Sequence, residues 1–166
     1  ELLENKAGDK IALTFINNLV TSLMKALGPI AQVQTLHGFA RALLYKHGGH
    51  GVSQGCDYYS SLTEILSADA TIILARDVDY WDIEGVLHEM ENATDVAKSA
   101  IASGTYYDAV GHTDSVYRVV RHLQGHPGDL PCFEQVVVDE FQDFSLLEVS
   151  LIRLLSTVSP TLLVGD

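Results

Sequence analysis

Two adjacent carboxylates, Asp139 and Glu140, stand directly after the apolar run Val136–Val138. Three consecutive valines predict a buried strand, and open α/β sheets bind their ligands beyond the carboxyl ends of the strands. A magnesium ion on a nucleoside triphosphate needs hard oxygen ligands, and attack on the γ-phosphate needs a base that positions water. Asp139 and Glu140 have the chemistry for these two tasks, and Gln142 and Asp143 add further polar groups nearby.

The acidic pair also has simpler interpretations. A lone Asp-Glu pair most often begins a solvated turn or caps the helix that follows. Here the preceding apolar strand and a second apolar run that ends in Asp166 favour a metal-nucleotide site. A third interpretation is a metal-dependent phosphoesterase, which would use Asp139, Glu140, Asp143 and Asp166 as hard ligands.

The elements that must position these groups alternate between strands and helices. Apolar patterns predict strands over residues 10–15, 31–35, 134–138 and 161–164. Helical spacing of apolar residues predicts helices over residues 19–27, 36–44 and 145–155. Strands that alternate with helices predict an α/β fold with a parallel sheet and right-handed crossovers.

The pattern changes between Tyr45 and Pro131, where short helical segments follow one another without a convincing strand. Ser61 and Glu64 have the spacing of a helix capping box. We therefore expect three parts: residues 1–45, the first part of the α/β domain; residues 46–130, an inserted helical subdomain; and residues 131–166, its second part.

Size and composition exclude several classes of protein. The chain has 166 residues, enough for one domain with a sizeable core, and its two cysteines have no zinc-ligand spacing. It contains no run of about 18 apolar residues, so we expect no membrane segment and a cytoplasmic protein. The formal charge of −12 argues against general binding of nucleic acid.

The acidity is concentrated in residues 46–130, which carry thirteen acidic and five basic residues. Such a segment repels phosphates, so it either carries a small basic patch around Arg118 and Arg121 or meets a protein partner. An ordinary solvated helix face is the simpler interpretation of Arg118 and Arg121. The pairs Tyr80–Trp81 and Tyr106–Tyr107 are either stacking residues or, more commonly in a helical segment, core residues.

Residues Val138–Asp143 resemble motif II of the UvrD/Rep/PcrA-type superfamily 1 helicases. Three further segments follow that family's order: residues 13–17 are similar to motif Ia, residues 35–40 to motif Ib, and residues 163–166 to the start of motif III. The resemblance implies a RecA-like domain of the P-loop NTPase type. It also implies that the segment between motifs Ib and II is a helical subdomain inserted in that domain.

The resemblance implies roles at the matching positions. Asp139 would hold the magnesium ion of ATP, and Glu140 would orient and deprotonate the attacking water. Gln142 and Asp143 would belong to the network that links nucleotide state to the grip on DNA, and Asp166 would lie near it. ATP and Mg²⁺ are the implied cofactors.

The same resemblance implies that four residues line a path for single-stranded DNA, where an aromatic ring can stack on a base. They are Phe15, Asn17, Thr35 and His37. Each also has a structural interpretation: Phe15 as a core residue, His37 as a packing or capping residue, and Asn17 and Thr35 as helix caps.

The chain departs from the family pattern in what it lacks. It contains no Gly-x-x-x-x-Gly-Lys-Ser/Thr phosphate loop, and Asn18 stands where many relatives have Lys. We therefore expect a fragment of an ATP-dependent DNA helicase or translocase, of the kind that acts in DNA repair, which alone neither hydrolyses ATP nor unwinds DNA. The alternative is a non-catalytic protein-interaction module derived from a helicase, with the partner bound through the acidic insertion.

Overall fold

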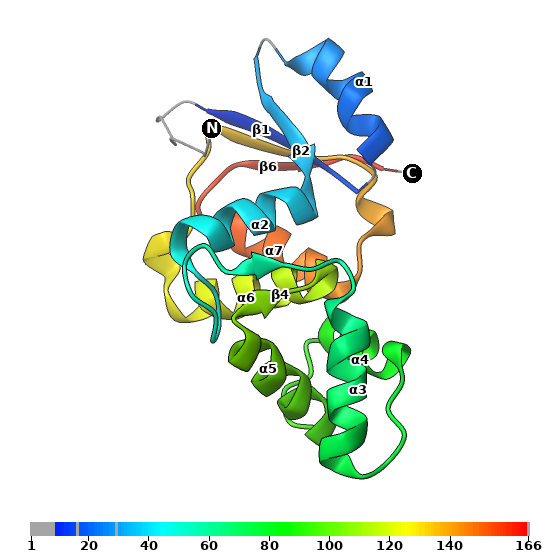
Figure 1. Cartoon of the computed structure of the whole chain (residues 1–166). Helices are drawn as coiled ribbons and strands as arrows, with labels where there is room; N and C mark the ends of the chain where they lie inside the picture. The colour runs from blue at the N-terminus through cyan, green and yellow to red at the C-terminus, as the bar shows by residue number, and fades with distance from the viewer. Residues whose placement is uncertain (1–8, 16, 29, 166) are drawn as a thin grey trace.

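The computed structural model describes residues 9–15, 17–28 and 30–165, without the side chains of Asn17 and Asn18. Its main sheet has four parallel strands in the order β2-β1-β5-β6 (Figure 1). The strands are β1 (Lys10–Thr14), β2 (Gln32–Thr35), β5 (Gln135–Val138) and β6 (Thr161–Leu163). The predicted α/β class with a parallel sheet flanked by helices is confirmed.

Strand β1 is buried on both faces, whereas buried and half-buried residues alternate along β5. Ile11 and Leu13 of β1 and Val136 and Val138 of β5 pair side by side and are fully buried. Helices α2 (Leu36–His47) and α7 (Leu146–Ser156) cover this face, and α1 (Asn17–Leu27) lies on the other (Figure 1). The helices predicted beside the strands are therefore present in the predicted order.

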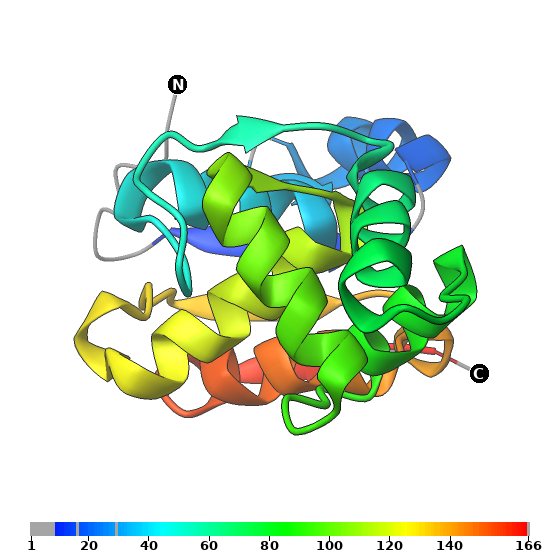
Figure 2. The same ribbon diagram turned by 60° about the horizontal axis from the view of Figure 1, so that its bottom comes forward.

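The segment between α2 and β5 is mostly helical, as expected. It contains α3 (Leu62–Leu74), α4 (Tyr80–His88), α5 (Asp95–Tyr107) and α6 (His112–Gly125), with a short 3₁₀ turn η1 (Pro127–Asp129). Helix α3 packs against α4 and α5, and these three lie on the side of α6 away from the main sheet (Figures 1 and 2).

Two short strands in this segment were not expected. Strand β3 (Asp57–Tyr58) pairs in parallel with β4 (Ala109–Val110). Each strand has two residues, which is too short to produce a visible alternation in the sequence.

Helix α6 lies within residues 46–130, the predicted insertion, but its packing extends beyond that segment. It packs against both α2 and α7, the helices that cover the main sheet. The buried residues of α6 include polar ones as well as Val116, Val119 and Leu123, so the helix is enclosed on more than its apolar stripe. By packing, α6 therefore belongs with the α/β layer as much as with α3–α5.

Arg118 lies in neither a basic patch nor a solvated face, so both interpretations of this residue were wrong. Its side chain is fully buried, and its Nε donates to both carboxylate oxygens of Asp114 at 2.9 and 3.0 Å. The remaining nitrogens donate to the carbonyls of His50 and Ile101. The planar guanidinium satisfies its donors inside the protein, which the i, i+3 spacing from Arg121 could not indicate.

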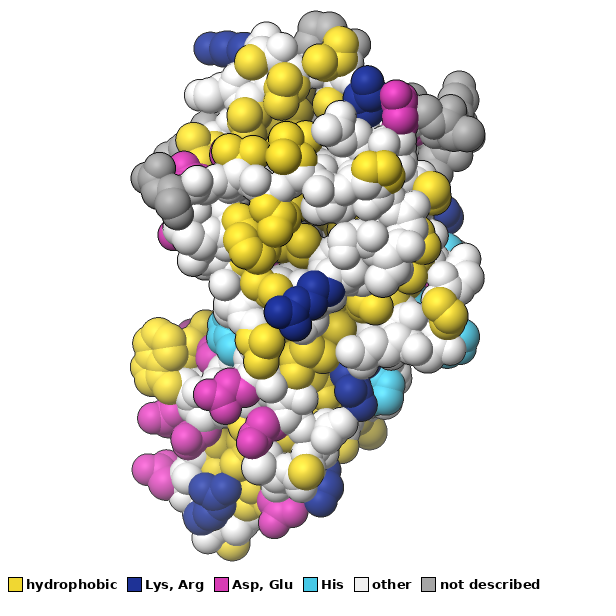
Figure 3. Space-filling model, turned by 180° about the vertical axis from the view of Figure 1, so that it is seen from behind, with side chains coloured by type: hydrophobic (Ala, Val, Ile, Leu, Met, Phe, Trp, Pro, Cys, Tyr) yellow, Lys and Arg dark blue, Asp and Glu magenta, His cyan; other side chains and the backbone are white. Residues whose placement is uncertain are grey.

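The aromatic pairs of the intervening helices are exposed, so their interpretation as core residues was wrong. Trp81 is 75% exposed and Tyr106 is 85% exposed, while Tyr80 and Tyr107 pack edge-on against them. Hydrophobic side chains lie among acidic ones over this part of the molecule (Figure 3). Among the described helices, none has the length and apolar character needed to cross a membrane.

The expected capping box at Ser61 is also absent, because the Ser61 side chain makes no cap hydrogen bond. A capping box occurs instead at the start of α4, where Asp79 and Asp82 each accept a hydrogen bond from the backbone N–H of the other. Aspartate at the third helical position serves here in place of the usual glutamate.

Candidate functional site

The acidic pair lies at the carboxyl end of β5, an interior strand of the sheet. The backbone N–H of Asp139 still donates to the carbonyl of Leu13 on β1, at 2.9 Å. Glu140 then turns the chain into the 3₁₀ turn η2 (Phe141–Asp143). Asp139 and Glu140 are thus held at the edge where all four parallel strands end, the position expected from the sequence.

Glu140 has a left-handed backbone with φ of 55°, which is unfavourable for any residue with a Cβ. Its carboxylate accepts a hydrogen bond of 2.6 Å from the Gln142 side-chain amide. The amide thus holds the Glu140 carboxylate against Gln142 within this turn. Backbone strain of this kind is concentrated at functional sites in proteins.

The end of β6 completes this edge. The backbone N–H of Phe141 donates to the carbonyl of Val164 at 2.9 Å, so η2 is tied to the residues that follow β6. A Cβ at Gly165 would collide with the Oε1 of Gln142. Glycine at this position therefore lets Gln142 lie close to the chain leading to Asp166, which itself lies outside the described residues.

Phe15 combines exposure with a place at the same edge. It follows the last residue of β1, its ring is 42% exposed, and it packs edge-on against Phe144 with 5.7 Å between centroids. Its interpretation as a core residue does not fit this exposure. A partly open aromatic ring beside the acidic loop is the arrangement that base stacking requires.

Thr35 and Asn17 both lie at helix starts. The Thr35 hydroxyl accepts a hydrogen bond from the backbone N–H of Gly38 at 3.0 Å and caps α2. Asn17 is the first residue of α1, and its side chain lies outside the described residues. The hydrogen bond to Gly38 establishes the capping role of Thr35. Thr35 is half-buried, and a contact of this residue with DNA rests on the resemblance alone.

His37 is a packed residue, with only 6% of its surface exposed. Its ring stacks on that of His112 at a centroid distance of 3.8 Å, and its Nε2 lies 3.5 Å from Glu148 of α7. Burial lowers the pKa of His37 to about 4, and the nearby charges of His112 and Arg41 add to this effect. The side chain is therefore neutral near pH 7, and one face of its ring is covered by the ring of His112.

A polar network that was not predicted as a whole joins α4 to α7. His88 of α4 lies 3.1 Å from the Ser145 hydroxyl and 3.5 Å from Glu84. Glu148 accepts the backbone N–H of Ser145 at 2.7 Å, and the capping pair 145 and 148 was predicted. Only the i, i+4 spacing of Glu84 and His88 pointed to a contact in the network, because its other members are far apart in the chain.

Glu84 is the most heavily bonded member of this network. It accepts hydrogen bonds from Thr63 at 2.9 Å and Thr113 at 2.6 Å. Burial works to raise the pKa of Glu84, but the hydrogen bonds from His88, Thr113 and Thr63 outweigh it and leave the pKa lowered. The hydrogen bond to Glu84 raises the pKa of His88.

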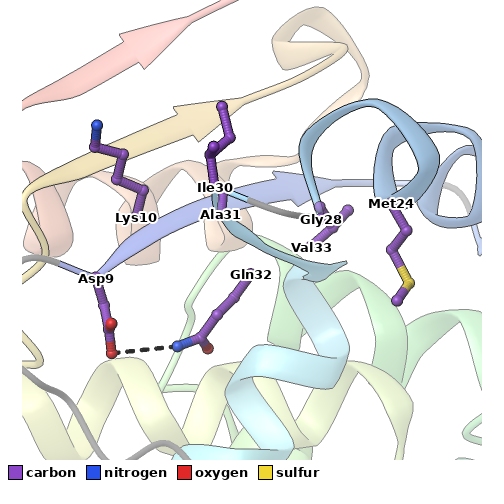
Figure 4. Close-up of a pocket in the computed structure, with 8 residues that line it drawn as sticks. All are labelled: Asp9, Lys10, Met24, Gly28, Ile30, Ala31, Gln32 and Val33. Carbon is purple, nitrogen blue, oxygen red and sulfur yellow. Dashed lines mark hydrogen bonds between the residues drawn. The ribbon is translucent and has the colours of Figure 1, made fainter.

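A hollow in the described surface does not adjoin the acidic pair. It has a volume of about 390 Å³ and lies at the amino ends of β1 and β2 (Figure 4). Gln32 donates across it to Asp9 at 3.4 Å. A second hollow of about 340 Å³ lies between α7 and β6, and its lining combines apolar residues with Arg153, Ser156 and Thr161.

Within the described part of the chain, no three His, Cys, Asp or Glu side chains come together as a metal-binding group. Asp139, Glu140 and Asp143 are not brought together as such a group, and Asp166, the fourth ligand of the phosphoesterase interpretation, lies outside the described residues. Asp139 as a single carboxylate fits the other arrangement, in which phosphate oxygens and water supply most of the ligands to magnesium.

Comparison with models of known protein families gives no match for this chain, and comparison with curated protein sequences gives none either.

Proposed function

We propose that this chain is part of an ATP-dependent DNA helicase or translocase of the UvrD/Rep type, and that it contributes a RecA-like domain with a helical insertion. The observation that carries the proposal is the position of Asp139 and Glu140 at the carboxyl end of the interior strand β5. The strained backbone of Glu140 and its hydrogen bond from Gln142 support a functional role for this turn.

In this scheme the two carboxylates have different tasks. Asp139 holds the magnesium ion of ATP, which neutralises charge on the phosphates. Glu140 accepts the proton of the attacking water, and Gln142 keeps its carboxylate in one orientation. Phe15 stacks a base of single-stranded DNA close to this loop, so that movement of the loop is transmitted to the strand through Phe144.

The scheme also requires a phosphate loop, which these 166 residues do not contain. Strand β6 is an edge strand of the described sheet, with Leu162 and Val164 about half exposed. Its open edge is suited to one more parallel strand, which would bring a phosphate loop to the same edge as Asp139. By itself the chain is expected to bind ATP weakly and not to hydrolyse it, because phosphoryl transfer depends on positioning.

The test is Glu140→Gln in a protein that includes the phosphate loop. Removal of the base should reduce ATP hydrolysis by roughly 10²–10⁴-fold and leave ATP binding within a few-fold of its original affinity. Glu134→Gln is the matched control, because Glu134 is an exposed glutamate paired with Lys10 at the opposite end of the sheet. Unchanged hydrolysis in the Glu140→Gln protein would remove Glu140 from the mechanism and the proposal with it.

A second candidate function is a protein-interaction module, and the exposed aromatic residues of α4 and α5 favour it. Trp81 and Tyr106 are open to solvent, and Asp77, Asp79 and Asp82 surround Trp81 in the sequence. Acidic residues repel phosphates, whereas an aromatic ring among carboxylates attracts Lys and Arg side chains. This surface therefore suits a basic peptide segment better than it suits DNA.

Trp81 is the only tryptophan of the chain, so its fluorescence reports on this surface directly. Titration with an oligo-arginine peptide should change the emission, and the change should weaken as salt is raised. Oligothymidylate of equal length is the control and should leave the emission unchanged. A response to oligothymidylate instead would support DNA binding by these helices and exclude the interaction module.

A further inference from the structure

Thr14 is the last residue of β1, and its hydroxyl is an unsatisfied polar group. The side chain is fully buried, and its Oγ1 has no hydrogen-bond partner among the described residues. A buried hydroxyl without a partner destabilises a fold, and buried polar groups of this kind call for an explanation. β-Branching explains a valine here as well as a threonine, so the strand does not account for the hydroxyl.

The register of the sheet brings Thr14 beside Asp139. Leu13 of β1 pairs with Val138 of β5, so Thr14 and Asp139 are the next residues of the two neighbouring strands. The hydrogen bond from the Asp139 backbone N–H to Leu13 continues this ladder by one residue. Thr14 shares its face of the sheet with Ala12, which pairs with Val137, and alternation gives Asp139 the same face.

Other polar groups at this edge are already engaged. The Thr35 hydroxyl on the far side of Thr14 caps α2, and the Gln142 amide donates to Glu140. The Asp139 carboxylate, in contrast, makes no hydrogen bond or ion pair with the described residues. An unused donor therefore lies beside an unused acceptor.

We propose that Thr14 is a positioning residue for the ion site: its hydroxyl donates to the Asp139 carboxylate when that carboxylate holds a divalent cation. A carboxylate that binds an ion through one oxygen keeps the other free for a hydrogen bond, and such a bond fixes the angle of the ligand. The proposal rests on the proposed function, because it takes Asp139 as the ion ligand. It adds a residue whose contribution is orientation and not contact with the ion.

The decisive variant is Thr14→Val, which keeps the shape of the side chain and removes only the hydroxyl. Because the hydroxyl is unsatisfied in the free protein, the 166-residue chain should gain thermal stability, with a midpoint higher by about 2–4 °C. In a protein that includes the phosphate loop, Mn²⁺ binding in the presence of ADP should weaken by about 10–100-fold, as measured by electron paramagnetic resonance. Thr14→Ser should retain the original Mn²⁺ affinity.

Ser99 provides the matched control. Its hydroxyl on α5 is also buried without a partner, in a helix that does not pack against the main sheet. Ser99→Ala should therefore raise the thermal midpoint and leave Mn²⁺ binding unchanged. This result would show that the loss of affinity in Thr14→Val does not follow from stabilisation alone.

Asp139→Asn separates failure of this inference from failure of the proposed function. If Asp139→Asn weakens Mn²⁺ binding and Thr14→Val does not, the positioning role is overturned and the ion site stands. If Asp139→Asn also leaves Mn²⁺ binding unchanged, both proposals fail. A lower thermal midpoint in Thr14→Val would mean that the hydroxyl is satisfied within the folded chain, which would overturn the inference as well.

Discussion

The left-handed backbone of Glu140 is expected to lower the stability of the folded chain. A non-glycine residue in the left-handed region costs about 1–3 kcal/mol, and the surrounding hydrogen bonds of η2 must hold it there. Glycine adopts the same backbone without this cost. A sequence selected for stability alone would therefore favour glycine over glutamate at position 140.

We predict that Glu140→Gly stabilises the chain by about 1 kcal/mol, because relief of strain exceeds the entropy that glycine adds to the unfolded state. Urea unfolding measures the change. Ala75→Gly is the control, since Ala75 has a φ of 49° at the end of α3. Both variants should gain stability, but only Glu140→Gly should lose ATP hydrolysis in a protein with the phosphate loop. Equal hydrolysis in the two variants would mean that the Glu140 side chain is not the catalytic base.

The neutral state of His37 makes the fold sensitive to acid. The pKa of His37 is about 4 in the folded chain and near 6.5 in the unfolded chain. Between these two values the unfolded state binds the extra proton, so stability falls as the pH falls from 6.5 toward 4. His112, whose pKa is also lowered by burial, acts in the same direction.

His88 and Glu84, in the polar network between α4 and α7, change stability with pH in a different way from His37. The pKa of His88 is raised, so its contribution is complete below 6.5 and is lost as the pH rises through its folded value. The pKa of Glu84 is lowered, so its contribution is present above 4.5 and is lost as the pH falls through its folded value. Near pH 5 Glu84 is still ionised. At this pH protonation makes His37 destabilise the fold, whereas protonated His88 stabilises it.

We predict that His37 alone costs the chain about 2 kcal/mol at pH 5 relative to pH 7, the value that its two pKa values give. His37→Gln should therefore show a smaller acid-induced loss of stability than the original chain, measured by urea unfolding at both values. His126→Gln is the control, because His126 stacks on His122 at an exposed position and is not part of this network. An unchanged pH dependence in His37→Gln would show that His37 titrates normally.

At the scale of elements, the buried ion pair of α6 explains how three segments are held together. Arg118 contacts Asp114 on its own helix, His50 in the loop after α2, and Ile101 on α5. A Cβ at Gly104 would collide with the guanidinium, and Gly51 also lies against it. The glycines make room for an arginine that pairs with backbone carbonyls of two other segments.

We expect Arg118→Met to destabilise the chain by about 3–5 kcal/mol, because it leaves the Asp114 carboxylate buried without its partner. Denaturant unfolding measures this loss. Arg121→Met should change stability by less than about 0.5 kcal/mol, since Arg121 is half-exposed and its side chain donates a hydrogen bond to the nearby Gln124 on the protein surface. The double variant Arg118→Met with Asp114→Leu should recover much of the loss. A small effect of Arg118→Met alone would contradict the role of this pair.

The elements of the α/β part were predictable because each has a strong periodic pattern. The valines of β5 and the stripes of α2 and α7 gave these elements within one or two residues at most ends. The acidic pair followed from the same pattern, since its position depends only on where β5 ends. Periodicity does not predict contacts between distant segments, such as the stack of His37 on His112. For the same reason it could not show that the Thr14 hydroxyl lacks a hydrogen-bond partner among the described residues.

The exposure of the aromatic residues of α4 and α5 was predicted poorly for a related reason. An aromatic residue is core or surface according to which helices cover it, and α4 contacts α3, α5, α6 and α7. Ile83 and Leu87 of α4 are buried, whereas Trp81 is left exposed. The spacing of apolar and aromatic residues along α4 can be read from the sequence. Which of these residues other helices cover depends on the tertiary packing.

For the whole molecule, the distribution of exposed apolar residues has a consequence in solution. Strand β6 exposes Leu162, Leu163 and the adjacent Val164 along an edge of the sheet, next to the hollow against α7. An apolar edge strand pairs readily with another chain unless charge or cover prevents it. The net charge of −12 opposes association in general, but within β6 and Val164 there is no charged residue.

We therefore predict that the 166-residue chain associates through β6 at high protein concentration. Leu162→Lys should shift the chain toward the monomer in analytical ultracentrifugation, because an ammonium group at this edge must be desolvated for a second strand to pair. Ile72→Lys is the control, since Ile72 is 79% exposed on α3 and far from the sheet edge in sequence and packing. High salt should strengthen association of the original chain by screening its acidic charge. If Ile72→Lys dissociates the chain and Leu162→Lys does not, the associating surface is on the intervening helices, and the edge of β6 has no role in it.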